Sequence, residues 1–440
     1  MSKRYPGGFL TNSPPTTTGP TFGYGGGTAP GVWTLSQAIT LQQSNLWPAP
    51  ITQRQLWTWG LNAAGENGQG TTTQNRSPLQ VGSDSTWGLM SMGWVSTAAS
   101  KQDGTLWAWG SNNFGQLGQG NTTNLSSPVQ VGALTDWPFA TKNTLCAGGA
   151  ISNAGTAANT TSCLVVKPNG TLWAWGNNYR GQLGTSNTTH FSSPVQIGAL
   201  TTWATVCTSG NSTAAVKTDG TLWTWGSNIQ GQLGSGNAVG TARSSPVQVG
   251  TDTNWKAACL GGYFGSLVAI KTNGTIWSSG YNSAGTLGLN DTTRRSSLTQ
   301  IGALTTWSSI VVGGSSTAAI STTGALWTWG VNAGGQLALS NQTNYSSPKQ
   351  VGSLTNWVLV SLFGGAYTSA NNAGFFALKT DGTFWTSGTY TGSGNVLLNA
   401  PTSTSSPSQV GALTTWKFVQ LGARQGNGGS GNSAVSARTS

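Results

Sequence analysis

The feature that most constrains the fold is a seven-residue sequence that recurs along the chain. It reads LWTWGLN at Leu56, and close variants follow six more times, the last being FWTSGTY at Phe384. The first tryptophans of these copies are Trp57, Trp107, Trp173, Trp223, Trp277, Trp327 and Trp385. A second set, as in VGALTDW, comprises Trp87, Trp137, Trp203, Trp255, Trp307, Trp357 and Trp416. Self-similarity at a period of about fifty residues indicates a repeat architecture.

One repeat, WATVCTSGNSTAAVKTDGTLWTWGSN (203–228), contains three short apolar runs separated by Gly-containing turns. Asp219-Gly220 is a strong hairpin signal, because Gly accepts a positive φ without steric cost. A glycine-rich loop follows, and SPVQVG supplies a fourth run that opens at Pro246, which a strand start or outer edge tolerates. The sequence therefore predicts an all-β, seven-bladed β-propeller with four-stranded antiparallel blades, whose tryptophans pack the core and the blade interfaces.

The two ends of the chain complement each other. The first copy lacks the strands that precede LWTWG elsewhere, and the C-terminal WKFVQLGARQGNGGSGNSAVSA resembles this missing pair. We expect the C-terminal strands to complete the blade that begins near residue 54 and so to close the ring, which removes open sheet edges. Residues 51–440 are then the propeller, and residues 1–50 are a separate segment.

The pattern LWxWGxNxxGQLGxG…SSPxQVGxLTxW, clearest in residues 106–137, resembles the repeat of the regulator of chromosome condensation family, a seven-bladed propeller. The resemblance covers about residues 54–440. The first copy has GENGQG in place of the GQLG core and the last departs after Gly388, so the resemblance defines the fold but not the loop shape at these two places. The family name implies guanine-nucleotide exchange as one activity, although none of its functional residues can be assigned here. Similar repeats also build secreted β-lactamase inhibitor proteins.

The first fifty residues are rich in Pro, Gly and Thr and predict an extended arm without a core of its own. Thr34 and Gln37 stand at capping-box spacing before a stop at Pro48, which predicts one short helix. The string KRYPGG…APGVWTLSQ resembles an N-terminal segment of structural proteins of marine tailed phages. This resemblance implies an attachment arm on a virion. The residues we expect to dock the arm are Arg4, Tyr5, Pro6, Trp33, Leu35, Ile39 and Trp47.

Composition excludes several classes of protein. Charged residues make up only 6% of the chain, and the formal net charge is +11. Lys and Arg are scattered, with no run longer than Arg294-Arg295, so we do not expect nucleic-acid binding. No stretch approaches the ~18 apolar residues of a membrane-spanning helix, and the start has no apolar signal region. The expectation is a protein made in the host cytoplasm without a signal peptide.

The residues that usually carry catalysis are few. There are eight acids and one histidine, His190. Six acids occupy recurring positions, either in the turn between apolar runs or just before the second tryptophan, and nothing nominates a pair for glycoside hydrolysis. These six are Asp103, Asp219, Asp381, Asp84, Asp136 and Asp252, while Glu66 and Asp291 are not periodic. We expect His190 to be a loop or packing residue, and the protein to be no enzyme, with no cofactor and no metal.

Two other residue types recur at matching positions. Cys146, Cys207 and Cys259 match on inner strands, which predicts buried small thiols, and a bridge between Cys146 and Cys163 stays open. A lysine recurs before the turn, at Lys101, Lys167, Lys217, Lys271 and Lys379. Two interpretations are open for these lysines: solvated strand ends, or a ring that docks on an anionic surface.

The large insertions all lie in the connection between the first and second strands of a repeat, at 139–162, 261–266, 363–376 and 422–432. Insertions on one face of a repeat fold usually mark its working surface. The candidate binding residues there are Phe139, Tyr263, Phe264, Phe363, Tyr367 and Arg424. The alternative is that these aromatic residues only cap the ring.

We therefore expect a non-enzymatic virion structural or attachment protein of a tailed bacteriophage, present in many copies. Its arm would bind other virion proteins, and its propeller loops would bind a host-surface glycan or protein, or neighbouring subunits. The alternatives are a secreted inhibitor-like binding propeller, a guanine-nucleotide exchange factor and a glycan-degrading fibre.

Overall fold

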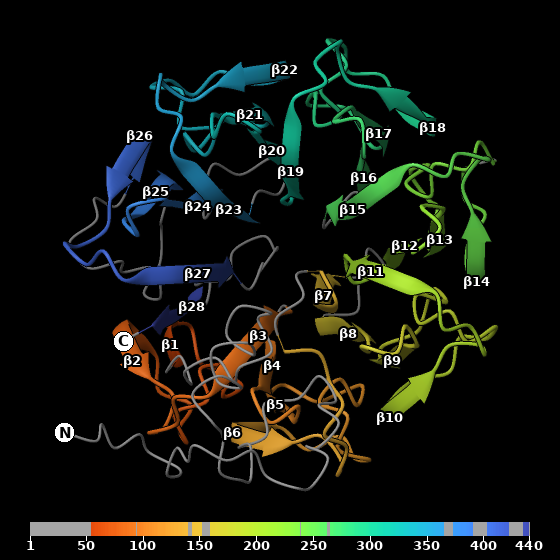
Figure 1. Ribbon diagram of the computed structural model, residues 1–440, viewed down its shortest axis with the longest axis vertical. Coiled ribbons are helices and arrows are strands. Elements are labelled where there is room, and N and C mark those ends of the chain that lie inside the picture. Colours follow the sequence, from red (N-terminus) through yellow and green to blue (C-terminus); the bar gives the residue numbers. More distant parts are fainter. Residues whose placement is uncertain are drawn as a thin grey trace, which may run out of the picture.

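The computed structural model describes residues 54–93, 95–139, 143–151, 159–237, 239–261, 265–364, 373–389, 403–421 and 434–439. Within these ranges the chain forms strands, turns and loops, and contains no helix of the length and apolarity that a membrane crossing requires. The strands form seven four-stranded antiparallel sheets around a common axis (Figure 1). The expected arm and short helix of residues 1–50 lie outside the described residues.

Six of the sheets are blades of four consecutive strands. Blade 1 comprises β3 (Trp87–Met92), β4 (Ser96–Lys101), β5 (Leu106–Gly110) and β6 (Leu125–Gln130), and blade 2 comprises β7 (Leu145–Ile151), β8 (Asn159–Val166), β9 (Leu172–Gly176) and β10 (Phe191–Gln196). Blade 3 comprises β11 (Trp203–Thr208), β12 (Ser212–Lys217), β13 (Leu222–Gly226) and β14 (Arg243–Gln248). Blade 4 comprises β15 (Trp255–Gly261), β16 (Ser266–Lys271), β17 (Ile276–Gly280) and β18 (Arg295–Gln300). Blade 5 comprises β19 (Trp307–Val312), β20 (Ser316–Ser321), β21 (Leu326–Gly330) and β22 (Tyr345–Gln350), and blade 6 comprises β23 (Trp357–Gly364), β24 (Ala373–Lys379), β25 (Phe384–Thr389) and β26 (Ser403–Gln409).

The remaining sheet, here called the closing blade, joins the two ends of the described chain. It consists of β1 (Arg54–Gly60), β2 (Asn75–Gln80), β27 (Trp416–Leu421) and β28 (Ala434–Thr439), in the order β2-β1-β28-β27. β1 runs antiparallel to β28, with Leu56 opposite Ala437. The first strand of each blade contacts the first strand of the next, and β27 contacts β3, so the ring closes as the sequence predicts.

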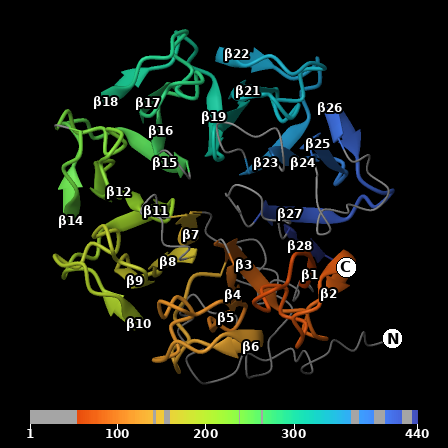
Figure 2. The ribbon, with the colours of Figure 1, turned by 180° about the vertical axis from the view of Figure 1, so that it is seen from behind.

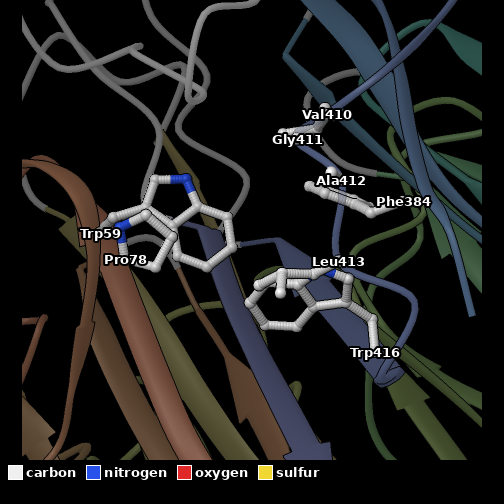
Figure 3. A pocket seen from close by; sticks show the side chains of 8 residues that line it. All are labelled: Trp59, Pro78, Phe384, Val410, Gly411, Ala412, Leu413 and Trp416. Atoms are coloured by element: carbon white, nitrogen blue, oxygen red, sulfur yellow. The ribbon is translucent and has the colours of Figure 1, made fainter.

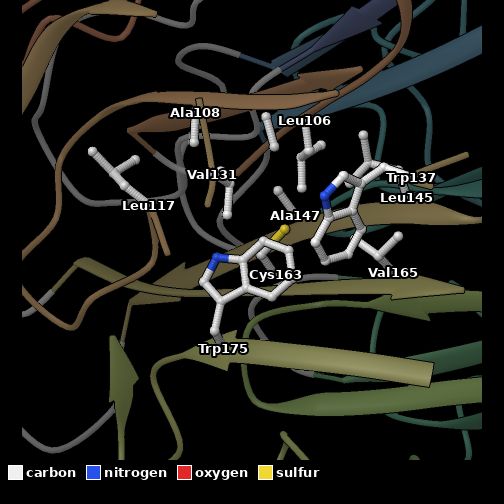
Figure 4. Packing of buried hydrophobic residues seen from close by; sticks show 11 residues of the cluster. Leu106, Ala108, Leu117, Val131, Trp137, Leu145, Ala147, Cys163, Val165 and Trp175 are labelled. Atoms are coloured by element: carbon white, nitrogen blue, oxygen red, sulfur yellow. The ribbon is translucent and has the colours of Figure 1, made fainter. Parts of the chain in front are cut away.

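The second tryptophan of the LWxWG sequence ties each blade to the one before it. Trp109, Trp175, Trp225 and Trp329 are fully buried. Each indole N–H donates to a backbone carbonyl of the preceding blade at 2.8–2.9 Å; Trp225, for example, donates to Gln182. Figure 4 shows one such core, where Trp175 and Trp137 of blade 2 pack against Leu106 and Val131 of blade 1. The predicted packing role of the tryptophans is confirmed.

Two blades lack this tryptophan and compensate on the neighbouring strand. Thr213 lies opposite Trp225 in blade 3, but Leu267 lies opposite Ser279 in blade 4, and Phe375 lies opposite Ser387 in blade 6. The large side chain has moved from the third strand to the second. The larger side chain on the second strand thereby fills part of the volume that the missing indole would occupy, as close packing requires.

The loop of the first copy, whose shape the sequence left open, is regular. Gly65 and Gly68 adopt positive φ values of 85° and 68°, as Gly115 and Gly118 do in the GQLG loop of blade 1. Glu66 replaces the glutamine: its carboxylate accepts the Ala64 N–H at 2.8 Å, and its carbonyl accepts the indole of Trp109. The last copy's departure, residues 390–402, lies outside the described residues.

Candidate functional site

The connections between the third and fourth strands share one face of the propeller with the turns between the first and second strands. In blade 3, Ser227 at the start of the loop donates its N–H to Asn211 of the turn. We call this side, which carries the sequence-predicted insertions, the loop face. The opposite side carries the Asp-Gly turns.

The loops on this face are held as a rigid framework. In blade 1 the side chain of Asn112 accepts the N–H of Leu117 at 2.9 Å and donates to the carbonyl of Asn121 at 3.0 Å. Gly115 sits at φ 77°, and a Cβ there would lie 2.3 Å from the Cα of Ser192 in blade 2. A side chain has no room at this position, so each loop rests directly on the outer strand of the next blade.

An aromatic cluster stands on the loop face where blade 1 meets blade 2. Phe114 comes from the loop of blade 1, whereas Tyr179 and His190 come from the loop of blade 2. The ring centroids lie 4.6 Å apart for Tyr179 and His190, 5.1 Å for Phe114 and His190, and 5.8 Å for Phe114 and Tyr179, all edge to face. The side chain of Tyr179 remains 59% exposed. The cluster therefore presents a fixed aromatic ring to solvent.

His190 has the packing role that the sequence predicts. Its Nδ1 accepts the backbone N–H of Asn178 at 2.9 Å. In blades 1 and 5 the side-chain oxygens of Asn124 and Asn344 accept the equivalent N–H groups. Partial burial lowers the pKa of the imidazole below its ordinary value, because the charged form is poorly solvated there.

All eight carboxylates of the chain lie in the described part, and each accepts a hydrogen bond or forms an ion pair within the propeller. Those in the turns bind the threonine two residues later; the Asp219 carboxylate accepts from both the N–H and the hydroxyl of Thr221. The partners of the others are Ala64 for Glu66, Lys101 for Asp84, Lys167 for Asp136, Lys271 for Asp252, Arg295 for Asp291, Thr105 for Asp103 and Thr383 for Asp381. The acids therefore serve the framework.

Three arginines on the loop face are not neutralised in this way. Arg180 and Arg294 are exposed and Arg243 is half-buried. Among the described residues, none of the three has an ion pair within 4.0 Å, whereas Arg295 pairs with Asp291. The loop face of blades 2 to 4 therefore carries positive charge without a nearby free carboxylate.

The recurring lysines are neither solvated strand ends nor a docking ring, so both sequence interpretations are wrong. The Nζ of Lys101 lies 3.7 Å from the ring centroid of Trp107 and 4.8 Å from that of Trp87, in the corner formed by these two edge-to-face indoles. The same arrangement holds Lys167, Lys217, Lys271 and Lys379, which are 4–8% exposed. Cation–π attraction to the two aromatic rings replaces part of the lost hydration.

Each of these five lysines has an acid nearby, either before the first strand of its blade or in the turn that follows the lysine. Lys167 and Lys271 pair with Asp136 and Asp252, which precede the first strand of their blade. Lys217 instead has Asp219 in the following turn. Burial lowers the pKa of Lys217, and the charge of Asp219 opposes this shift. The lysines are therefore part of an internal charge balance.

The matching cysteines join neighbouring blades. The Sγ of Cys146 accepts the N–H of Thr208 at 3.2 Å, and the Sγ of Cys207 accepts the N–H of Leu260 at 3.4 Å. The Sγ atoms of Cys207 and Cys259 lie 3.8 Å apart. These three thiols are half-buried and only Cys163 is fully buried, and all four cysteines are free. Burial raises the pKa of Cys163, and the hydrogen bond with Cys146 together with burial raises that of Cys207.

Two hollows lie on the seams of the closing blade. One, of about 90 Å³, is lined by Trp59, Phe384, Trp416 and other apolar residues (Figure 3). The other, of about 510 Å³, is lined in part by Asp84, Trp87 and Lys101. The first is smaller than the usual ligand site, and the charges in the second neutralise each other. Within the described ranges, no three His, Cys, Asp or Glu side chains are placed to hold a metal ion.

Most of the binding residues predicted from the sequence lie outside the described residues. Phe139 is half-buried: its ring covers Gly88, and the guanidinium of Arg54 lies 5.0 Å from its centroid. Phe363 stands near the end of β23, opposite Gly374. Tyr263, Phe264, Tyr367, Arg424 and the seven arm residues lie outside the described residues. The aromatic cluster was missed because its members do not repeat and meet only across two blades.

Comparison with known proteins identifies the repeat. The model of the regulator of chromosome condensation (RCC1) repeat matches residues 103–144, 169–216, 219–268 and 323–370, and a second RCC1 repeat model matches residues 89–116. No curated protein matches the sequence. The chain is thus an all-β propeller that contains RCC1 repeats.

Similar solved structures agree on the fold. Human WBSCR16 superposes with a TM-score of 0.69 at 18% identity, covering 88% of this chain and 99% of the other. Prp20p from Saccharomyces cerevisiae, described with its binding properties to Gsp1p and histones, gives 0.68 at 16% identity, covering 89% and 92%. Yeast RCC1 (Prp20) in complex with Kap60 gives 0.68 at 15% identity, covering 89% and 90%. At these identities the likeness concerns the fold alone.

Proposed function

We propose that this chain is a non-enzymatic binding protein of a tailed-phage virion, which engages its partner through the loop face. The observation that carries the proposal is that the side chains fall into two groups, those with partners inside the propeller and those presented to solvent on the loop face. The carboxylates, the recurring lysines and the inner thiols make contacts inside the framework. The loop face, in contrast, presents exposed Tyr179 and unpaired arginines on rigid loops.

A binding function accords with the state of the groups that catalysis would need. Two of the carboxyls, Asp219 and Asp381, have a lowered pKa because the side-chain hydroxyl and backbone N–H of a threonine bind the charged form. The thiols of Cys163 and Cys207 have raised pKa values, and Nδ1 of His190 is occupied by a backbone N–H. A general base or nucleophile requires the opposite tuning of these groups.

The virion role rests on the N-terminal segment, whose sequence over residues 3–48 resembles the attachment segment of phage structural proteins. A surface poor in ions also suits a long-lived particle. In this proposal the arm binds other virion proteins through the residues named above, such as Tyr5 and Trp33. The propeller is displayed outward in many copies and contacts a host-surface glycan or protein.

The test is the incorporation of a chain that lacks residues 1–48 into particles. Within the described residues every strand of the propeller begins at Arg54 or later, so the deletion removes none of these strands. We expect soluble, folded propeller that is absent from purified particles. A full-length chain carrying Arg180→Gln is the matched control and should be incorporated normally. Normal incorporation of the deleted chain would refute the role of the arm.

A second candidate is guanine-nucleotide exchange, which the fold likeness to Prp20p favours because Prp20p is described with its binding to Gsp1p. A nucleotide-release assay with a small GTPase separates the two proposals. Release accelerated by the purified propeller would support exchange and contradict a purely structural role.

A further inference from the structure

The loop face of blades 1 to 4 carries a row of aromatic and arginine side chains, in which the arginines have no ion pair among the described residues. We call it the aromatic–arginine band. Its members are Phe114, Tyr179, Arg180, His190, Arg243 and Arg294. They come from four successive loops, and the outer strands that follow these loops, β6, β10, β14 and β18, succeed one another along the rim (Figures 1 and 2).

Backbone contacts between the loops make the band continuous. A Cβ on Gly181, next to Arg180, would lie 2.5 Å from the Cα of Ser244 and 3.1 Å from the carbonyl oxygen of Arg243. In the same way, a Cβ on Gly231 would lie 2.9 Å from the carbonyl oxygen of Arg295, beside Arg294. The backbone segments that carry the arginines therefore contact one another from blade to blade. Moving these segments apart would break the contacts.

The positive charge of the band favours an anionic partner. Every carboxylate of the chain already has a partner inside the propeller, and the formal net charge is +11. A guanidinium matches a carboxylate, sulfate or phosphate with two parallel hydrogen bonds. Arg180 and Arg294 are exposed and free to make such pairs, as is the exposed part of Arg243.

The remainder of the band is suited to sugars. The ring of Tyr179 is 59% exposed, and His190 and Phe114 fix its orientation. The same two loops also carry exposed amides and hydroxyls, among them Asn113, Asn187 and Thr188. A flat ring beside amides and hydroxyls complements a pyranose, which presents C–H groups on its faces and hydroxyl groups at its edges.

From these observations we propose that the aromatic–arginine band binds an acidic polysaccharide. The inference rests on the proposed binding function and names the class of its partner. A polysaccharide fits better than nucleic acid because blades 2, 3 and 4 each contribute a single free guanidinium, whereas nucleic-acid sites cluster their cations along a groove. An acidic sugar chain instead carries its charges at intervals along an extended backbone.

The experiment measures binding of polygalacturonate to the purified full chain by isothermal titration, with dextran as the neutral probe. We expect polygalacturonate to bind and dextran to bind at least about tenfold more weakly. The variant Arg180→Gln with Arg243→Gln should lose about tenfold in affinity for polygalacturonate, and Tyr179→Ala should lose several-fold. Lys256→Gln with Lys349→Gln removes the same charge outside the aromatic–arginine band and should change affinity less than about twofold. Thermal unfolding of each variant checks that it is folded.

Several outcomes would overturn the assignment. They are unchanged binding in the double arginine variant, an equal loss in the Lys256 and Lys349 control, and equally tight binding of single-stranded DNA or poly-glutamate. Absence of polygalacturonate binding also overturns it. Incorporation into particles depends on the arm and not on the band. If the full chain is incorporated normally but does not bind polygalacturonate, only the assignment of an acidic polysaccharide is overturned. Incorporation of the chain lacking residues 1–48 overturns the virion role instead.

Discussion

The exchange of large and small side chains between adjacent strands predicts how the blade interfaces respond to mutation. Trp225→Ser in blade 3 recreates one half of the arrangement in blade 4, where Ser279 stands opposite Leu267. Thr213→Leu recreates the other half. We expect each single substitution to destabilise the protein, and Thr213→Leu to become stabilising once Trp225 has been replaced.

The magnitudes follow from the contacts. Trp225 is fully buried, and truncation of such a side chain costs about 3–5 kcal/mol. Thr213→Leu alone places extra carbon atoms against the indole and removes a hydrogen bond to the Gln182 carbonyl at 2.8 Å, for about 1–3 kcal/mol. In the cavity left by Trp225→Ser, the leucine buries apolar surface, and this gain exceeds the lost hydrogen bond by about 1 kcal/mol.

The assay is equilibrium unfolding in guanidinium chloride, followed by far-UV circular dichroism for the parent, both single variants and the double variant. The expected coupling free energy is at least about 1 kcal/mol in favour of the double variant. The matched control combines Thr213→Leu with Trp329→Ser in blade 5, where the two changes share no contact and should be additive. Additivity of the blade 3 pair to within about 0.5 kcal/mol would refute the volume exchange.

Three further predictions concern other parts of the propeller. Burial lowers the pKa of His190, so as pH falls the unfolded chain binds this proton before the folded chain does. Stability therefore falls as pH drops below the ordinary value of 6.5 towards the folded-state pKa. His190→Asn, which keeps an acceptor for the N–H of Asn178, should reduce the dependence of the melting temperature on pH over this range. Gly115→Ala should destabilise the protein by more than about 1 kcal/mol and by clearly more than Gly132→Ala, since both have positive φ but only Gly115 lacks room for a Cβ; equal melting temperatures would contradict this. Oxidation with diamide should link Cys207 to Cys259, whose sulfurs lie 3.8 Å apart, and not Cys163; peptide mapping by mass spectrometry identifies the bridge.

The sequence predicted the architecture because the tryptophans mark every blade at the same two positions. It also predicted that β28 would pair with β1, since the C-terminal segment supplies the strands missing before Leu56. The sequence left the loop shape at GENGQG open, and the loop is regular because Glu66 uses its carboxylate and its carbonyl as the repeated glutamine uses its own groups. A substitution that preserves the acceptors preserves the turn.

The site was harder to predict than the fold for a physical reason. The lysines appeared exposed because they precede turns, and only the structure brings two edge-to-face tryptophans, distant in the sequence, against each ammonium group. The aromatic cluster has no periodic signal at all. Its weak trace in the sequence is the presence of the aromatic residues Phe114 and Tyr179 at two loop positions that hold no aromatic residue in blades 3, 4 and 5.

The repeats also show which charges belong to the framework. Blades 2 and 4 place an acid before the first strand and an asparagine, Asn169 or Asn273, in the turn, whereas blades 3 and 6 place the acid in the turn. Blade 5 has Ser321 in place of the lysine and no acid at either position. Lysine and acid thus appear and disappear together, as a buried charge requires a partner of opposite sign. Arg180, Arg243 and Arg294 have no such companion, so framework stability does not account for them, and their positive charge is available to a partner outside the chain.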